Sequence, residues 1–308
     1  MTVNLKTKLF GRVYQFKNVK EVLAKANEEK SGDRLAGIIA ESMEERIAAK
    51  HVLANLTVAD LRNNPVVPYE QDEVTRVIQD DVNERIYSEI AGWTLSDLRE
   101  WILCDGTTGD DIKRISRGIT SEVVAGTAKL MTNLDLVYGA SKIRIQAHCN
   151  TTIGIPGTLS ARLQPNHPTD DIDGVTASVF EGLSYGVGDA VIGLNPVDDT
   201  VDNVKKVLFK FQELKEKYEI PTQICVLAHV STQMEAVRQG APTDLFFQSI
   251  AGSQKGNEAF AISTALLTEA KELAAKQGTS VGPNFMYFET GQGRSEEHTS
   301  ELQSRVDI

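Results

Sequence analysis

Cysteine is scarce in this chain of 308 residues, which contains three: Cys104, Cys149 and Cys225. They are far apart, odd in number and without the CxxC spacing of zinc or redox motifs. This pattern argues against a disulfide framework and a cysteine zinc site, and it is typical of reduced thiols. We therefore expect a cytoplasmic protein.

Long hydrophobic runs and clusters of positive charge are also missing. No stretch approaches the ~20 apolar residues of a membrane-spanning helix, and the N-terminal segment MTVNLKTKLFGRVYQF has no long apolar core. Acidic and basic residues number 43 and 32, which gives a formal net charge of −11, and the basic ones are scattered. We expect neither a membrane nor a nucleic acid as a partner.

Several familiar catalytic motifs are absent. No GxGxxG follows a predicted strand, and the chain has no GxxxxGK[ST], no HExxH and no GxSxG elbow between a strand and a helix. Nicotinamide, nucleotide triphosphate, zinc-protease and serine-hydrolase chemistries therefore lose support.

The first part of the chain has helical periodicity. From Val19 to about Tyr138, apolar residues recur at steps of three and four. Thr57 and Thr94 each precede an aspartate by three residues, which is the spacing by which a hydroxyl and a carboxylate cap a helix start. We predict a helical N-terminal domain over residues 1–140.

After Thr151, short β-branched or aromatic runs alternate with amphipathic helices, as in a parallel sheet built from βα units. Two predicted helices are clear, one from Val201 to Tyr218 and one from about Asn257 to a left-handed cap at Gly278. The predicted strands are Gly157–Gln164, Ala190–Asn195, Gln223–His229, Leu245–Ile250 and Phe285–Glu289.

Polar side chains occur at the ends of these strands: Arg162 and Gln164, Asn195, His229, Gln248 and Ser249, and Glu289. In a (β/α)8 barrel the active site lies at the carboxyl ends of the strands, so the set predicts a site for a small molecule with an amino and a hydroxyl group. His229 is a doubtful member, because a lone histidine is more often structural. Polar residues facing water on an edge strand remain the alternative for Arg162 and Gln164.

Glu289 follows the apolar run FMYF, where a carboxylate needs a partner to offset desolvation. We favour the ammonium group of a ligand as that partner. The structural alternative is a buried ion pair with Arg162.

Long segments of the chain resemble the large subunit of ethanolamine ammonia-lyase: TTIGIPGTLSARLQPN, GVGDAVIGLNPV, CVLAHVSTQ, FFQSIAGSQKG and YFETGQG. The resemblance extends from about Lys6 to Gly293, and so includes the helical region. It implies an α/β fold, with the helical domain followed by an incomplete (β/α)8 TIM barrel in which about five of eight strands are present. It also implies adenosylcobalamin as the cofactor, and conversion of ethanolamine to acetaldehyde and ammonia by a radical route.

The resemblance assigns roles to individual positions. The implied substrate contacts are Arg162, Gln164, Asn195 and Glu289, with Arg162 and Glu289 as the catalytic pair. The implied cobalamin contacts are Pro196 and Gln248, and no side chain is expected to bind a metal. The implied partners are the small subunit and further large subunits, within the cytoplasm or a bacterial microcompartment.

The chain departs from this family at its end. The run RSEEHTSELQS, from Arg294 to Ser304, is the translation of a common short-read sequencing adapter. We therefore expect a partial barrel over residues 141–293 and a non-native tail over residues 294–308. We also expect this truncated chain to be inactive alone, since the last barrel strands would be missing.

Two alternative functions stay open. One is a non-catalytic assembly or binding fragment, which contacts sister subunits without catalysing a reaction. The other is a metal-assisted TIM-barrel hydrolase that uses His229, Glu289, Asp198 and Asp199. It is the weaker alternative, because both aspartates follow Pro196 in a loop and suit the start of the next helix.

Overall fold

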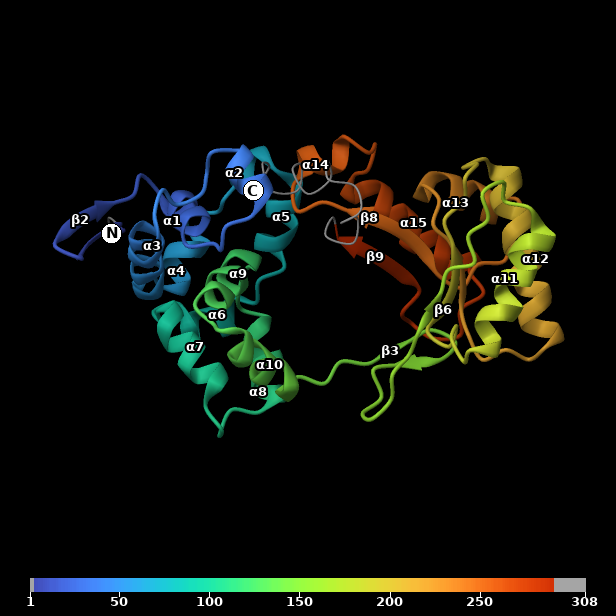
Figure 1. Ribbon diagram of the computed structural model, residues 1–308, viewed down its shortest axis with the longest axis horizontal. Helices are drawn as coiled ribbons and strands as arrows, with labels where there is room; N and C mark the ends of the chain where they lie inside the picture. Colours follow the sequence, from blue (N-terminus) through green and yellow to red (C-terminus); the bar gives the residue numbers. More distant parts are fainter. Residues whose placement is uncertain (1–2, 291–308) are drawn as a thin grey trace. The chain divides into compact units, whose positions relative to one another are not determined.

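The structure is a computed structural model in which residues 3–290 are described. The chain divides into two units (Figure 1). The helical unit comprises residues 3–144 together with Ala251–Asn257, and the α/β unit comprises residues 145–250 and 258–290. The chain is thus a mixed α/β protein, as predicted. The predicted adapter-derived tail lies outside the described residues.

The helical unit begins with an antiparallel hairpin that the sequence did not predict, formed by β1 (Lys6–Leu9) and β2 (Arg12–Gln15). Its helices are α1 (Val19–Lys25), α2 (Ser31–Leu35), α3 (Met43–Asn55), α4 (Val58–Arg62), α5 (Glu73–Asp80), α6 (Glu84–Ile90), α7 (Leu95–Leu103), α8 (Gly109–Ser116), α9 (Ser121–Lys129) and α10 (Asn133–Lys142), with a 3-10 turn at Tyr69–Gln71. α14 (Gln254–Glu258) lies almost wholly within Ala251–Asn257.

Reciprocal caps start several of these helices. The hydroxyls of Thr57 and Thr94 accept from the backbone N–H three residues on, and each aspartate there accepts from the threonine N–H, so both predicted caps are confirmed. Thr108 and Thr132 start α8 and α10 in the same way. Each cap is worth about 1 kcal/mol.

The α/β unit contains the five predicted strands. β5 (Arg162–Leu163), β6 (Val191–Leu194) and β7 (Ile224–Val226) form one parallel sheet in that order, and β8 (Phe246–Ile250) pairs in parallel with β9 (Met286–Thr290). A short antiparallel pair, β3 (Ala147–His148) and β4 (Thr152–Ile153), precedes them. The helices between the strands are α11 (Ile172–Ser184), α12 (Val201–Lys217), α13 (Val230–Arg238) and α15 (Thr264–Gln277). No closed barrel forms within residues 3–290.

Alternation along the strands gives the sheets two faces. Figure 1 shows α11 and α12 on one side of the strands, here called the helix face. The buried strand side chains that pack against these helices are Ile192, Leu194, Ile224 and Val226. The opposite face, here called the inner face, carries a second cluster: Val191, Cys225, Leu227, Leu245 and Tyr287. Gly193 is also on this face, where an added Cβ would lie 2.9 Å from the Cys225 sulfur. The strands therefore carry apolar side chains on both faces.

The first predicted strand is much shorter than expected. Gly157 has a positive φ of 79°, and the Thr158 N–H donates to the Ile155 carbonyl at 3.2 Å, so the chain turns there instead of extending. The extended part is limited to β5.

The helix predicted to begin near Asn257 begins later. Ala261 has a positive φ of 55°, and the Ser263 hydroxyl accepts from the Leu266 N–H at 3.2 Å to start α15. The predicted left-handed cap at Gly278 was wrong, because this residue has φ −66° and ψ 161°. Glycine is needed there for close approach, since a Cβ would lie 2.5 Å from the Ala274 carbonyl oxygen.

Among the described residues, none of the helices combines the length and the apolar composition that a membrane span requires.

Candidate functional site

Four predicted substrate contacts lie on or directly after strands of the α/β unit. Arg162 begins β5, Gln164 and Asn195 follow β5 and β6, and Glu289 lies near the end of β9. Gln164 and Asn195 are exposed, whereas Arg162 and Glu289 are half-buried. Arg162 pairs with Val191, the first residue of β6, so it enters the sheet deeper than a strand end.

Arg162 has the least satisfied polar group of the set. Its Nη1 donates to the Tyr287 hydroxyl at 3.0 Å, and its guanidinium carbon lies 5.8 Å from the centroid of that ring. Within the described residues, its Nε and Nη2 are buried without a hydrogen-bond partner. An unsatisfied buried donor costs about 1 to 3 kcal/mol. A ligand oxygen at these two nitrogens would remove that cost.

Tyr287 is a functional candidate that sequence reasoning missed. Its ring stands edge-on to Phe247 on the neighbouring strand, with the two centroids 5.3 Å apart and the planes at 76°. It precedes Glu289 by two residues on β9 and so shares its face. The alternation in FMYFE was the available signal, but nothing local indicates the contact with Arg162, which is 125 residues away.

Glu289 lies opposite Ser249 in the β8–β9 register. The Ser249 hydroxyl donates to its carboxylate at 3.4 Å, which is long for an O–H to oxygen hydrogen bond. Within residues 3–290 no ion pair joins Glu289 to Arg162, so the structural alternative for Glu289 is not observed. This carboxylate can accept further hydrogen bonds from a cationic ligand.

The loop after β6 places Asn195 and Pro196 side by side. The Asn195 N–H donates to the Asn166 side-chain oxygen at 2.9 Å. Pro196 is half-buried, and Val197 is 67% exposed. The loop thus offers one amide side chain and adjoining apolar surface.

His229 caps the start of α13. Its Nδ1 lies 2.7 Å from the Ser231 hydroxyl and accepts from the Ser231 N–H, while its Nε2 lies 3.0 Å from the Phe260 carbonyl oxygen. A carbonyl can only accept, so Nε2 carries the proton. Both ring nitrogens are therefore bound within the protein, which favours the structural interpretation of His229.

Gln248 lies on the helix face, away from Arg162 and Glu289. It is 5% exposed, and its side-chain oxygen accepts from the Val230 N–H at 2.8 Å, at the start of α13. Its side-chain nitrogen donates to the Ser249 carbonyl at 3.1 Å. The structure thus does not bring this predicted cofactor contact together with the other site residues.

Burial disfavours the reactive thiolate form of the two thiols beside the site. Burial raises the pKa of Cys225 to about 12 and that of Cys149 to about 11, so both are protonated near neutral pH. Within the described part of the chain, no group of three or more histidine, cysteine or acidic side chains could hold a metal ion.

A family model described as ethanolamine ammonia lyase large subunit matches residues 14–308 of the chain. The chain belongs to this family. Among curated proteins, the ethanolamine ammonia-lyase large subunits of Escherichia coli strains K12 and O157:H7 are both 58% identical to it over 291 residues. That of Salmonella typhimurium strain LT2 is 57% identical over the same length. These matches cover 94% of the chain and 64% of each relative, so the chain spans less than two thirds of these large subunits.

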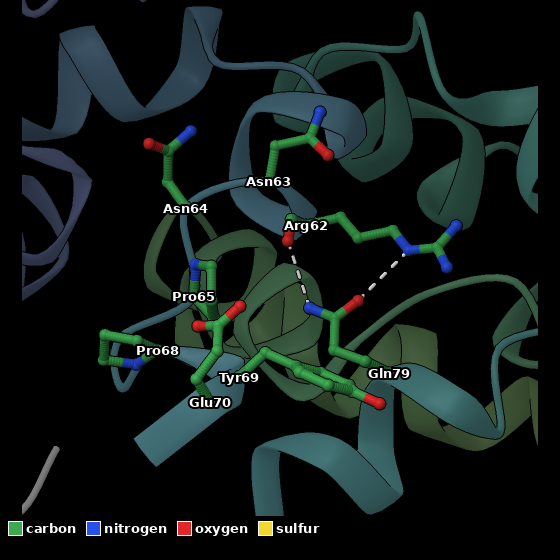
Figure 2. A pocket seen from close by; sticks show the side chains of 8 residues that line it. All are labelled: Arg62, Asn63, Asn64, Pro65, Pro68, Tyr69, Glu70 and Gln79. Carbon is green, nitrogen blue, oxygen red and sulfur yellow. Dashed lines mark hydrogen bonds between the residues drawn. The ribbon is translucent and has the colours of Figure 1, made fainter. Parts of the chain in front are cut away.

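The helical unit of this family member has a surface pocket of about 470 Å³, lined by Arg62, Asn63, Asn64, Pro65, Pro68, Tyr69, Glu70 and Gln79. Figure 2 shows two hydrogen bonds between Arg62 and Gln79 there. The Arg62 Nε donates to the Gln79 side-chain oxygen at 3.2 Å, and the Gln79 side-chain nitrogen donates to the Arg62 carbonyl at 3.0 Å. Glu84 pairs with both terminal nitrogens of Arg62. The cation of this pocket is therefore already neutralised within the protein.

A GxSxG sequence in this family member does not form the nucleophile elbow for which that motif is known. The segment GLSYG, from Gly182 to Gly186, matches GxSxG, but Ser184 is the last residue of α11 and its hydroxyl donates to the Glu181 carbonyl at 2.6 Å. A nucleophile elbow needs a strand before the serine. This serine is therefore part of a helix end.

Proposed function

We propose that this chain is part of the catalytic large subunit of an adenosylcobalamin-dependent ethanolamine ammonia-lyase, which converts ethanolamine to acetaldehyde and ammonia. Family membership and the 58% identity to the Escherichia coli relative support the proposal. Because the chain spans 64% of that relative, the activity is inferred for the protein that contains this chain.

The observation that carries the proposal is the pair of buried, unpaired nitrogens of Arg162. Ethanolamine has a hydroxyl oxygen that can accept from Nε and Nη2, and an ammonium group that can donate to Glu289. Charged hydrogen bonds of this kind are stronger than neutral ones. The amides of Gln164 and Asn195 complete the proposed substrate contacts, with Arg162 and Glu289 as the catalytic pair.

The residues fit the proposed cofactor in part. Adenosylcobalamin, when bound, supplies the radical chemistry of the reaction. Pro196 and the exposed Val197 offer apolar surface for a large flat group. Gln248 fits less well, because its side chain is bound to α13 on the helix face, and its proposed contribution is to fix the start of that helix. The apolar side chains of the inner face would keep water away from the reacting atoms of the bound substrate.

We further propose that β5 to β9 are five strands of a (β/α)8 barrel. They run in sequence order with helices between them, and the Leu245 N–H donates to the Ile224 carbonyl at 3.2 Å, which joins the two parallel sheets. A barrel needs eight strands to close. The remaining strands would belong to the part of the relatives that this chain does not match.

The proposed partners follow from the family. A protein named as a large subunit implies a small subunit beside it. We also propose self-association of large subunits, and a location in the cytoplasm or within a bacterial microcompartment. The hydrolase alternative loses support, because His229 is bound within the protein and Asp199 accepts from the His229 N–H at 2.9 Å. The assembly-only alternative predicts no adenosylcobalamin binding, which a cobalamin titration of the large subunit would measure.

The test is Glu289→Gln in the large subunit that contains this sequence, produced with the small subunit. This change keeps the shape of the side chain and removes its charge. Charged hydrogen bonds are worth ~1.5 to 3 kcal/mol, so kcat/KM for ethanolamine should fall about tenfold or more. Acetaldehyde release measures the effect.

The matched control is Glu269→Gln on α15. Glu269 is an exposed carboxylate that pairs with Arg238 at 2.6 Å, and the same substitution there should leave turnover unchanged. Wild-type kinetics in Glu289→Gln would contradict the assignment of Glu289.

A further inference from the structure

Asp170 sits between β5 and α11 and is almost completely buried, at 3% exposure. Its Oδ2 accepts from the backbone N–H groups of Val197 and Asp198, at 2.8 and 2.9 Å. The same oxygen accepts from the Asn203 side chain at 2.7 Å. One buried carboxylate therefore binds both the loop after β6 and the first turn of α12.

Asn166, from the same connection, binds the other end of that loop through the Asn195 N–H. Pro196 has no N–H to offer. Side chains of the β5–α11 connection thus accept every backbone N–H from Asn195 to Asp198. The conformation of the loop that carries Asn195 and Pro196 is set by Asn166 and Asp170.

The backbone of Asp170 is itself in an unfavourable conformation. Its φ is +50°, in the left-handed region that residues other than glycine rarely adopt, although aspartate adopts it more readily than most of them. Its second carboxylate oxygen is buried and has no partner among the described residues. Strain and an unpaired polar atom both lower stability, and such costs gather where a local geometry serves function.

We propose that Asp170 is a positioning residue, whose carboxylate holds the Asn195–Asp198 loop in the conformation that presents Asn195 to the substrate and Pro196 to the cofactor. This inference rests on the proposed function of those two residues. It assigns to Asp170 no contact with either ligand.

The experiment compares Asp170→Ala and Asp170→Asn with Asp171→Ala. Asp171 is the adjacent aspartate, and its side chain accepts from the Gly174 N–H at 2.9 Å to cap α11, without a contact to the loop after β6. Asp171→Ala therefore removes a carboxylate and one hydrogen bond from the same segment, at an exposed position. Asp170→Asn keeps an oxygen acceptor and should fold even if Asp170→Ala does not.

The first measurement is amide hydrogen exchange of this chain. In Asp170→Ala, and less so in Asp170→Asn, the amides of Val197 and Asp198 should exchange about tenfold faster or more, since a charged hydrogen bond is lost at each. The amides of β6 should keep their wild-type rates. Unchanged exchange at Val197 and Asp198 in both variants would overturn the proposal.

The second measurement uses the large subunit with its small subunit. In both Asp170 variants the Kd of adenosylcobalamin, from its absorbance, and the KM for ethanolamine should rise, by about tenfold in Asp170→Ala. Asp171→Ala should match the wild type. Faster exchange with wild-type Kd and KM would overturn the positioning role, whereas absence of ethanolamine turnover in the wild type would overturn the proposed function alone.

Discussion

Gln223 and Asp244, which precede β7 and β8, are buried side chains with their polar atoms paired, whereas Arg162 on the inner face keeps two unpaired nitrogens among the described residues. Gln223, fully buried, accepts from the N–H groups of Asn150 and Thr151 at 3.2 and 3.1 Å and donates to the Ala190 carbonyl. Arg162 has a single protein acceptor within the described residues, the Tyr287 hydroxyl.

Asp244, which precedes β8, extends the contrast. Its Oδ2 accepts from the Ile224 N–H at 2.8 Å and from the Lys215 ammonium at 2.7 Å, and its Oδ1 accepts from the Thr279 hydroxyl at 2.6 Å. Glu289, near the carboxyl end of β9, has one long hydrogen bond, from the Ser249 hydroxyl, within residues 3–290. The paired groups before β7 and β8 therefore stabilise the unit, and Arg162 and Glu289 on the inner face hold polar atoms that a ligand can use.

The largest effect on stability is expected at Asp244. Asp244→Ala would leave the Lys215 ammonium, only 15% exposed, without its carboxylate, and the Ile224 N–H without its acceptor. Removing one partner of a buried ion pair costs about 3 to 5 kcal/mol. Urea unfolding of the α/β unit should show this loss. Labelling of the buried thiols Cys149 and Cys225 monitors the unfolding.

Glu269→Ala is the control for this loss, because it breaks an exposed ion pair with Arg238 and should cost less than about 1 kcal/mol. Thiol labelling is the suitable probe, since both tryptophans, Trp93 and Trp101, belong to the helical unit. A loss for Asp244→Ala as small as that of the control would remove the contrast between the paired and the unpaired groups.

A smaller effect is expected at high pH. Burial raises the pKa of the Cys225 thiol to about 12, with a further contribution from the charge of Asp244, while Arg162 opposes the shift. Burial likewise raises the pKa of the Cys149 thiol to about 11. Because the folded pKa values lie above the unfolded value of about 8.5, these thiols stabilise the fold fully below that pH and lose their contribution as the pH rises towards 11 and 12.

Urea midpoints followed by circular dichroism between pH 8 and 11, roughly the window that these shifts define, measure this loss. Cys225→Ala should flatten the decline, because it removes one of the two titrating groups. Cys104→Ala, at an exposed thiol of the helical unit, should leave the slope unchanged. Equal slopes in Cys225→Ala and the wild type would show that burial of this thiol has no part in alkaline stability.

Local patterns in the sequence predicted much of the fold. The spacing of Thr57 and Thr94 from their aspartates is a short-range signal, and both caps are present. The apolar stripe of α12 is buried at Val204, Phe211 and Leu214, because a helix of this length exposes one face to solvent. The five strands were also predictable from short-range patterns, namely alternation and β-branched content.

The contacts that define the candidate site were not predictable in this way. Tyr287 meets Arg162 across 125 residues, and Asp170 binds a loop 27 residues further on, so both depend on how the strands pack. Strand alternation could place Gln248 and Ser249 on opposite faces, but only the fold shows that the face of Gln248 is covered by α13. The resemblance to a family assigned residues to the candidate site. The structure adds Tyr287, which contacts Arg162, and Asp170, which binds the loop after Asn195.

The smallest change in stability is expected for Arg162→Met, compared with Lys215→Met on α12. Arg162 is half-buried with Nε and Nη2 unpaired, so an apolar side chain of similar length removes an uncompensated charge and should change the free energy of unfolding by less than about 1.5 kcal/mol in either direction. Lys215→Met instead leaves Asp244, fully buried at its side chain, without its ammonium partner, and should cost several times more. In the large subunit with its small subunit, Arg162→Met should nevertheless abolish ethanolamine turnover. Equal destabilisation by the two substitutions would mean that Arg162 is as structural as Lys215, and that its unpaired nitrogens are not kept for a ligand.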